Sequence, residues 1–408
     1  MRSILRSLHI HAKKDTEVSR SGRDPKAFYL IAEPGYPNYG DELIAGEWLS
    51  LLGKYYPETP VVVDCARPGP AAVILRDKHP HAIFTDTLRR LGTENPFPYD
   101  GPINDIAGFV GDALNDEGIA PNYASGIRLL QHGVQSIHML GGGYMRGDWT
   151  CNLSRLAIGP WAHERNIPVA ATGLGLMPIK GDSLRFAQQS VKSFDVFTVR
   201  DVPTQTALQG ELMGDAADTV KVAPDDCFVN GLEGCYASPE GLPDVMVCIQ
   251  SDFVVEQQAL FEQVRRTLER WGVEKDDAIG VVECNPRIDY PILPYLSERG
   301  YSNLRFFPII DVLEKGFPAR AGQRWLSTRY HPHILAAAKG CSGSFISVDS
   351  GYYDVKHDAV IRMGSQWTQN LIGQPVPLAG PGFTDENLAQ RYSTQIRQNV
   401  SAIYPRVM

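Results

Sequence analysis

Residues 325–340 read WLSTRYHPHILAAAKG, and this stretch indicates how the rest of the chain is organised. Its first part is predicted to be a short strand, and Pro332 occupies the first turn of an alanine-rich helix that a glycine ends. Alternate side chains of an extended segment share a face, so we expect Arg329 and His331 to project together and Tyr330 to point the other way.

A guanidinium, an imidazole and the free N–H groups of a helix start would then converge on one point. That combination is typical of an anion site with a proton donor beside the anion. The alternative is a buried strand–helix junction in which Arg329 is salt-bridged and His331 is a satisfied neighbour of the core. The tripeptide alone does not separate the two interpretations.

The bulk composition limits the classes of function. A chain of 408 residues is too long for one ordinary core, so two domains are expected. A hydrophobic content of 43% and a charged content of 21% are those of a soluble globular protein. The formal net charge of −8 argues against nucleic acid or an anionic membrane as general partners, because both require a positive field. An anionic substrate must therefore be bound by a local basic pocket.

The cysteines and the apolar runs indicate a cytoplasmic protein. The seven cysteines are scattered and contain no C-x-x-C pair, which fits reduced thiols better than disulfides or a zinc site. No metal-ligand spacing is visible, and no run approaches the ~20 apolar residues that span a bilayer. Residues 1–26 are predicted to be a flexible basic tail. Acidic residues dilute its charge, so this interpretation is preferred over a weak attachment to anionic lipid.

Compact apolar runs alternate with helical patterns throughout the chain. This alternation predicts an α/β protein with two doubly wound, Rossmann-like domains that face each other across a cleft. The strands are expected at residues 27–32, 60–64, 136–140, 167–172, 194–199, 245–249, 278–282, 304–308 and 343–348. The predicted domains span 27–235 and 243–375, and a final amphipathic helix at 384–403 packs back on the first domain. The Pro- and Gly-rich region 65–122 is interpreted as an excursion over the cleft.

Turn residues and glycines follow several predicted strands. Asn38 and Gly40 release the first strand into a helix whose first turn carries Asp41. Gly142 and Gly143 follow another strand, at the sheet edge where ligands of open α/β sheets bind.

Gly173 and Gly175 repeat this arrangement, but the third glycine of a dinucleotide site is missing. Arg200 stands at the tip of the strand at 194–199, where it is either a second anion ligand or part of a structural ion pair. Tyr353 and Lys356 follow the strand at 343–348, and Lys356 either adds positive charge to the cleft or is a solvated helix residue.

Several of these motifs together resemble the polysaccharide pyruvyl transferase family. The first is Ser327-x-Arg329-x-His331 followed by a helix of small residues. The others are Asn38-x-Gly40-Asp41, the triple glycine at 141–143, Gly173 and Gly175 with Pro178, Arg200-Asp201-x-x-Thr204, and Tyr353 with Lys356. Leu174 and Met177 depart from the family pattern in the second glycine segment.

The resemblance implies a glycosyltransferase-B-like fold and a specific reaction. Members of the family transfer the pyruvyl group of phosphoenolpyruvate onto two hydroxyls of one sugar, which yields a cyclic ketal and phosphate. No cofactor is implied. Arg200 and Arg329, with Lys356, would bind phosphoenolpyruvate, and His331 would be the general acid. Asp41 would accept a hydroxyl proton, unless it only caps a helix.

The cleft side that receives the acceptor would be formed by Asn38, Gly40, Gly142, Gly143, Gly173, Gly175 and Tyr353. The implied partners are phosphoenolpyruvate and a sugar of a cell-surface glycan or its precursor, free or lipid-linked, with no nucleic acid and at most peripheral membrane contact. A nucleotide-sugar glycosyltransferase of the same fold is the main alternative, but no paired carboxylates follow a second-half strand to hold a ribose. A non-catalytic sugar-binding relative is the third interpretation.

Overall fold

The structure is a computed structural model that describes residues 26–210, 214, 218–252, 254, 256–349 and 351–407. Residues 1–25 of the expected tail lie outside the described residues, so the tail stays a prediction. Within the described residues, no helix has both the length and the apolar character needed to cross a membrane.

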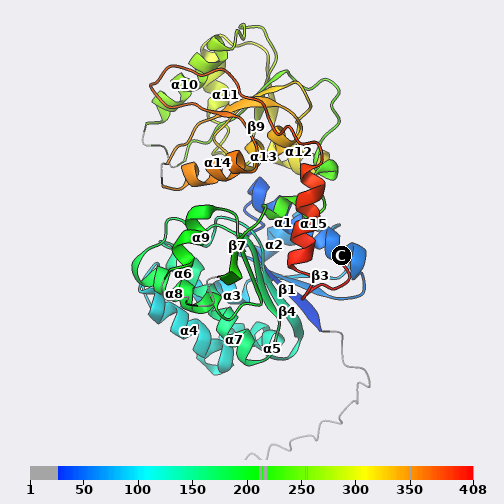
Figure 1. Ribbon diagram of the computed structural model, residues 1–408, viewed down its shortest axis with the longest axis vertical. Coiled ribbons are helices and arrows are strands. Elements are labelled where there is room, and N and C mark those ends of the chain that lie inside the picture. The colour runs from blue at the N-terminus through cyan, green and yellow to red at the C-terminus, as the bar shows by residue number, and fades with distance from the viewer. Residues whose placement is uncertain are drawn as a thin grey trace, which may run out of the picture.

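The described part of the first half forms a seven-stranded parallel sheet in the order β3-β2-β1-β4-β5-β6-β7 (Figure 1). Its strand β1 (Ala27–Ile31), which lies between β2 and β4, is buried along its whole length, as expected for a strand with helices on both faces. The other strands are β2 (Val61–Asp64), β3 (Ala82–Thr85), β4 (Val134–Met139), β5 (Val169–Leu174), β6 (Val196–Val199) and β7 (Val220–Val222).

The helices of this half cover both faces of the sheet. They are α1 (Tyr39–Tyr55), α2 (Pro68–Ile74), α3 (Thr87–Thr93), α4 (Ile103–Asn115), α5 (Ala124–His132), α6 (Thr150–Leu153), α7 (Ile158–Glu164), α8 (Gly181–Val191) and α9 (Val202–Leu208). The short 3-10 turns are η1 (Glu117–Ile119), η2 (Pro121–Tyr123), η3 (Ser154–Ala157), η5 (Asp226–Phe228) and η6 (Glu233–Cys235). The start of α9 is as predicted, because the Asp201 side chain accepts a hydrogen bond from the backbone N–H of Thr204 at 2.7 Å.

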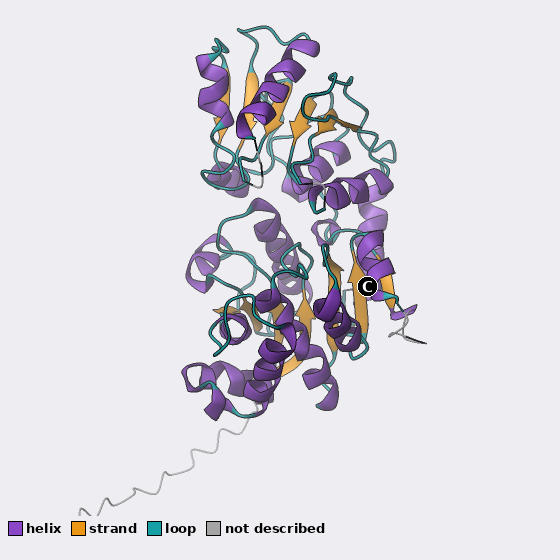
Figure 2. Ribbon diagram, turned by 90° about the vertical axis from the view of Figure 1, so that its left-hand side faces the viewer, coloured by secondary structure: helices purple, strands orange, loops and turns teal. Residues whose placement is uncertain are grey.

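The second half repeats the design with a six-stranded parallel sheet among the described residues, in the order β10-β9-β8-β11-β12-β13. The strands are β8 (Val245–Cys248), β9 (Ile279–Val282), β10 (Leu304–Phe307), β11 (Arg324–Ser327), β12 (Ser342–Phe345) and β13 (Thr368–Gln369). The helices are α10 (Gln257–Arg270), α11 (Ile292–Glu298), α12 (Ile309–Lys315), α13 (Tyr330–Ala338), α14 (Tyr353–Arg362) and α15 (Leu388–Asn399). Figure 2 shows the strands of both sheets enclosed by helices.

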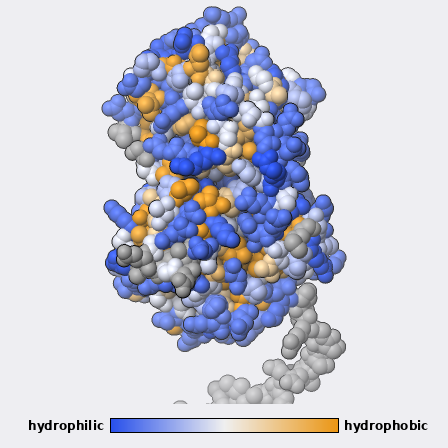
Figure 3. Space-filling view, in the orientation of Figure 1, coloured by the Kyte–Doolittle hydropathy of each residue, from blue (hydrophilic) through white to orange (hydrophobic). Residues whose placement is uncertain are grey.

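The strand orders place a crevice in each domain. The order of connection reverses between β1 and β4 in the first sheet, and between β8 and β11 in the second. Ligands of open parallel sheets bind at such a reversal, beyond the carboxyl ends of the strands. The two crevices face each other across a waist between the lobes, along which polar and apolar residues lie side by side (Figure 3). A backbone hydrogen bond crosses this waist, in which Tyr39 N donates to Cys284 O at 2.9 Å.

The last helix packs back on the end of the first domain. Ser393 Oγ and Arg397 Nε on α15 both donate to the carbonyl of Val229, at 2.8 and 3.0 Å. The helix begins at Leu388 after Asn387, four residues later than the Thr384 start expected from the sequence.

The strand–helix junction at 325–340 differs from the prediction. β11 ends at Ser327 and α13 begins at Tyr330, so His331 lies in a first helical turn and not on a strand. The helix can begin ahead of Pro332 because the first-turn N–H groups have no intrahelical partner, and a proline there loses no bond. The glycine that follows, Gly340, has a φ of +78°, as its predicted role in ending the helix requires.

The prediction for the region 65–122, an excursion over the cleft, was also wrong. It contributes the edge strand β3, and its helices α3 and α4 pack against the first domain. None of its described residues lines the cavity of the cleft, so it is not an excursion over the cleft. Its Pro and Gly residues sit between short helices that each bury one apolar face.

A buried carboxyl connects the elements beside the cleft. Asp226 accepts hydrogen bonds from Trp48 Nε1 on α1, from Thr172 Oγ1 on β5 and from Gly141 N after β4, at 2.9, 2.6 and 2.9 Å. Burial raises the pKa of Asp226 to about 7, against the lowering effect of these donors. The carboxyl therefore joins α1 to the middle of the sheet.

We expect Trp48→Ala to lower the free energy of unfolding by about 3–5 kcal/mol, because it removes a fully buried indole and one of the Asp226 bonds. Urea unfolding followed by far-UV circular dichroism measures the change. Val73→Ala on α2, where the side chain is 63% exposed, is the matched control and should change stability by less than about 0.5 kcal/mol. If Trp48→Ala and Val73→Ala lowered the free energy of unfolding equally, this account of the core would be wrong.

Candidate functional site

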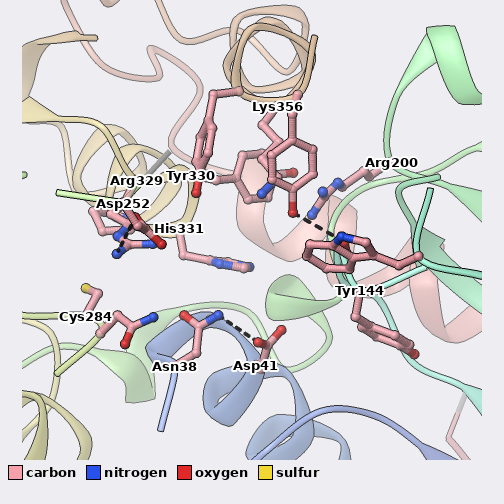
Figure 4. A pocket seen from close by; sticks show the side chains of 17 residues that line it. Asn38, Asp41, Tyr144, Arg200, Asp252, Cys284, Arg329, Tyr330, His331 and Lys356 are labelled. Carbon is pink, nitrogen blue, oxygen red and sulfur yellow. Dashed lines mark hydrogen bonds and ion pairs between the residues drawn. The ribbon is translucent and has the colours of Figure 1, made fainter. Parts of the chain in front are cut away.

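A cavity of about 240 Å³ lies where the two crevices meet, and side chains of both domains line it (Figure 4). Its walls come from the loops after β1, β4 and β6 and the start of α1 in the first domain, and from the loops after β8, β9 and β11 with the starts of α13 and α14 in the second. The lining residues are Asn38, Gly40, Asp41, Gly143, Tyr144, Trp149, Arg200, Asp252, Cys284, Asn285, Arg329, Tyr330, His331, Pro332, Tyr352, Tyr353 and Lys356.

The start of α1 forms one wall. Asn38 Nδ2 donates to Asp41 Oδ2 at 2.7 Å, so the asparagine side chain orients the carboxyl and makes no cap bond to the helix backbone. Burial raises the pKa of Asp41 to about 6, although the nearby His331 and Lys356 lower it. A carboxyl with this pKa can exchange a proton near neutral pH.

The His331 imidazole lies against this wall (Figure 4). A Cβ placed on Gly40 would lie 1.9 Å from His331 Nδ1, so only a glycine at this position leaves room for the ring. The other nitrogen, Nε2, is buried and lies 3.5 Å from Asp225 Oδ1. The ring is therefore held between the first turn of α1 and a carboxylate of the first domain.

Arg200 enters the cavity from the end of β6. Its side chain is buried, and a Cβ on Gly175 would lie 2.6 Å from Nε. The guanidinium carbon lies 4.9 Å from the centre of the Tyr330 ring, which belongs to the other domain. Arg200 forms no ion pair with any carboxylate of the described residues, and its Nε is buried without a hydrogen-bond partner. The structural ion pair considered from the sequence is thus not present in the described part of the chain.

Arg329, in contrast, is engaged in a buried ion pair. Its Nε and Nη2 both donate to Asp289 Oδ1, at 3.0 and 2.5 Å, and Asp252 lies 3.6 Å away. The Ser327 hydroxyl accepts from the Arg329 backbone N–H at 2.9 Å and fixes the turn that presents the side chain. Burial is the largest single influence and lowers the pKa of Arg329, but Asp289, Tyr353 and Asp252 together raise it above its usual range, so the guanidinium stays charged.

Lys356 supplies a third basic group, from α14. Its Nζ lies 3.5 Å from the centre of the Tyr352 ring and 4.5 Å from that of Tyr353. Burial lowers the pKa of Lys356 well below its usual range, and Arg200 and Arg329 lower it further. Lys356 makes no ion pair within the described residues, so an anion in the cavity would stabilise its charged form.

The structure brings most of the residues selected from the sequence into one cavity. Asn38, Gly40, Asp41, Gly143, Arg200, Arg329, His331, Tyr353 and Lys356 all line it. Gly142, Gly173 and Gly175 do not line it. Gly175 instead clears the path of Arg200, and Gly142 accepts the backbone N–H of Gly175 at 3.0 Å. Tyr330 also lines the cavity and does not point away, because it belongs to a helix and not to a strand.

Sequence reasoning missed other residues that face the cavity or support it. Asp252 follows β8 at the strand reversal, a position that could have suggested it. Trp149 and Tyr352 carried no motif of their own. Asp289 lies inside a loop, and no local pattern links it to Arg329, 40 residues later.

Cys248, Cys284 and Asp289 bring two sulfurs and a carboxylate oxygen within 4.8 Å of one another, as a metal site would. Their other contacts do not fit a metal. Asp289 Oδ1 accepts from Arg329, and Oδ2 accepts from the backbone N–H groups of Cys284 and Asn285 at 2.9 and 3.0 Å. Burial also raises the pKa of the Cys248 thiol, which disfavours the thiolate that a metal requires. The cluster supports Arg329.

We expect Asp289→Asn to lower the free energy of unfolding by about 3–5 kcal/mol, because the charge of Arg329 would remain buried without a full counter-charge. Chemical denaturation measures the change. Asp244→Asn is the control, since Asp244 pairs with Arg320 but its side chain is 80% exposed, and its cost should stay below about 1 kcal/mol. Equal costs for the two variants would show that Asp289 does not carry a buried ion pair.

Comparison with solved structures shows the fold. The chain is similar to a putative UDP-N-acetylglucosamine 2-epimerase from Listeria monocytogenes, with 14% identity and a TM-score of 0.51 over 94% of this chain and 97% of that one. It is also similar to the UDP-GlcNAc 2-epimerase from Neisseria meningitidis bound to UDP-GlcNAc, with 11% identity and a TM-score of 0.48 over 93% of this chain and 91% of that one. A third similar structure is MurG from Acinetobacter baumannii, with 12% identity and a TM-score of 0.45 over 94% of each chain. No curated protein matches the chain.

The two parallel-sheet domains that face each other across a cleft make the fold glycosyltransferase-B-like, as predicted. A family model described as polysaccharide pyruvyl transferase matches residues 38–350, which include the loop after β1, the triple glycine, Arg200 and the junction with Arg329 and His331. The chain therefore belongs to the polysaccharide pyruvyl transferase family.

Proposed function

We propose that this protein transfers the pyruvyl group of phosphoenolpyruvate onto two hydroxyls of a sugar in a cell-surface glycan or its precursor, with release of phosphate. The observation that carries the proposal is the pair of cavity-lining cations, Arg200 and Lys356, that form no ion pair in the described part of the chain. They lie in the same cavity as an imidazole, His331, and a carboxyl, Asp41.

The donor would be held by charge. Phosphoenolpyruvate has a phosphate and a carboxylate, and the cavity offers three cations for these two groups. Arg200 and Lys356 are available to an anion, whereas Asp289 already takes two N–H groups of Arg329. We therefore expect Arg200 and Lys356 to contribute most of the anion binding, and Arg329 to add positive field and its remaining N–H groups.

His331 is proposed as the general acid. It would give a proton to the methylene carbon of phosphoenolpyruvate, which makes the adjacent carbon electrophilic. One sugar hydroxyl then attacks that carbon and the second closes the ketal, while the carbon–oxygen bond to phosphate breaks. The two hydroxyl protons balance the reaction, because one replaces the proton that the methyl group gained and the other leaves with the phosphate.

Asp41 is proposed as the group that accepts a hydroxyl proton. It lies on the α1 wall, opposite the second-domain residues, and its raised pKa lets it take up a proton without strong cost. Asn38 holds the carboxyl in place through its 2.7 Å bond. Gly40, Gly143 and Tyr353 would border the acceptor.

The scheme uses side chains alone, so we propose that no cofactor takes part. The donor is a metabolite of the cytoplasm, where we place the reaction. The acceptor is a sugar, either free or carried by a lipid, and contact with the membrane would then be peripheral.

Thermal unfolding with phosphoenolpyruvate is the direct test of donor binding. A ligand at 100 times its dissociation constant adds ~2.7 kcal/mol of apparent stability, so the midpoint of the wild type should rise. Arg200→Ala should remove most of this rise. His331→Gln should keep it, because the imidazole is proposed to act on the proton and not on the anion, yet phosphate release with an acceptor should be lost.

Two outcomes would count against the proposal. A rise with a nucleotide sugar and none with phosphoenolpyruvate would favour a nucleotide-sugar glycosyltransferase. Near-normal phosphate release by His331→Gln would remove that residue from the acid role. Arg324→Ala, on the strand that leads to the junction but outside the cavity, is the control for the arginine substitution and should keep the rise with phosphoenolpyruvate.

We expect kcat/KM to rise with pH and level off above pH 6, because the base must be deprotonated and the pKa of Asp41 is raised to about 6. Asp41→Asn should lower kcat/KM by about 10²–10⁴-fold and remove this acid limb. A pH profile of initial phosphate release for both proteins measures the effect. If Asp41→Asn kept the acid limb of the pH profile unchanged, the limb would belong to another group and Asp41 would be an orienting residue.

A further inference from the structure

Two adjacent carboxyls, Asp225 and Asp226, follow β7 and are equally buried, with exposures of 1% and 0%. Their partners differ. Asp226 is surrounded by neutral donors that hold the first domain together. Asp225 lies beside the His331 imidazole, which comes from the second domain. The comparison separates the effect of burial on a carboxyl from the effect of an adjacent imidazole.

The contacts of the Asp225 carboxylate are one backbone N–H group and the His331 imidazole. Its Oδ1 accepts the backbone N–H of Cys227 at 3.0 Å and lies 3.5 Å from His331 Nε2. Its Oδ2 is buried without a hydrogen-bond partner. Both unsatisfied atoms, Asp225 Oδ2 and His331 Nε2, therefore sit in the same buried contact between the domains.

The charge of Asp225 follows from this contact. Burial would raise the pKa of Asp225, but His331, the Cys227 N–H and Arg200 together lower it to about 2. Burial raises the pKa of Asp226 to about 7. Of two neighbouring carboxyls with the same burial, the one that faces the imidazole has a lowered pKa and the other has a raised pKa.

The surroundings of His331 are defined on every side. Asp225 faces Nε2, Gly40 on α1 faces Nδ1, and the Tyr330 ring meets the imidazole edge-on at 5.0 Å. The charged groups around the ring are Asp225 from the segment before η5, Asp41 from α1, Arg200 from the end of β6 and Lys356 from α14. Among the ion pairs of the described residues, Asp225 is the carboxylate that lies within 4.0 Å of a His331 ring nitrogen.

We propose that Asp225 is a positioning residue for His331. The Asp225 carboxylate directs the Nε2 proton of His331 toward itself and stabilises the imidazolium, and this leaves Nδ1 as the nitrogen that transfers a proton in the cavity. The electrostatic part concerns the protein alone. The catalytic consequence rests on the proposed function, because it assumes that His331 protonates the donor.

The consequence for the reaction is a split of tasks between the two ring nitrogens. The Nδ1–H bond breaks as the methylene carbon gains its proton, and the neutral ring keeps its remaining proton on Nε2, toward Asp225. The carboxylate does not take a proton and does not touch the substrate. It keeps the acid charged before the transfer and the ring oriented after it.

Nuclear magnetic resonance of histidine-labelled protein tests the proposal without any substrate. In the wild type we expect the neutral imidazole of His331 to carry its proton on Nε2, and in Asp225→Asn the fraction protonated on Nε2 should fall about twofold or more, because the carboxylate that favours an N–H on that side is gone. His331→Gln identifies the resonances. Asp226→Asn is the matched control, since it alters the adjacent, equally buried carboxyl, and it should leave that fraction close to that of the wild type.

The wild type gives a second, independent readout if Asp225→Asn does not fold. Ring nitrogen shifts at high pH should show the neutral imidazole protonated on Nε2. A neutral ring protonated on Nδ1 in the wild type, or an unchanged fraction protonated on Nε2 in a folded Asp225→Asn, would overturn the proposal. In turnover, Asp225→Asn should lower kcat by about tenfold or more and leave KM for phosphoenolpyruvate nearly unchanged, because the carboxylate does not touch the substrate. The tautomer change in a protein that does not use phosphoenolpyruvate would keep this inference and reject the proposed function.

Discussion

Buried charge is the constraint on which the cleft depends. Arginine, lysine, histidine and aspartate side chains from both domains are brought into a small cavity where water cannot solvate them fully. Each charge is then either compensated within the protein or left available to a ligand. Arg329 is compensated by Asp289, and the His331 imidazole faces Asp225. Arg200 and Lys356 form no ion pair in the described chain, which leaves them available to an anion.

The parallel sheets provide the geometry for this arrangement. Each sheet reverses its strand order at one point, and the loops on both sides of that point diverge. Because the two domains face each other, the segments after β1 and β4 meet those after β8 and β11. The first domain supplies Asp41 and Arg200, and the second supplies Arg329, His331 and Lys356. Neither domain contains a complete site.

The sequence was a good guide where a local pattern carries the physics. Alternating apolar runs predicted both sheets, and Asp201 with Thr204 predicted the start of α9. Non-local contacts were not accessible. Gly175 looked like part of a ligand loop, whereas its role is to make room for Arg200, 25 residues later. The junction at 325–340 was misassigned because a proline is compatible with any position of a first helical turn, not only with its first residue.

The contact between Asp225 and His331 joins two domains, and this has a consequence for the timing of catalysis. If the lobes separate to admit substrates, the imidazole leaves its carboxylate and loses the contact that orients the ring. In the proposed reaction, an open enzyme would then bind the donor without an oriented acid. The acid would be in place only when the lobes are together, which is when bulk water has least access to the cavity. The contact between the domains would in this way restrict protonation of the donor to the closed enzyme and limit its hydrolysis.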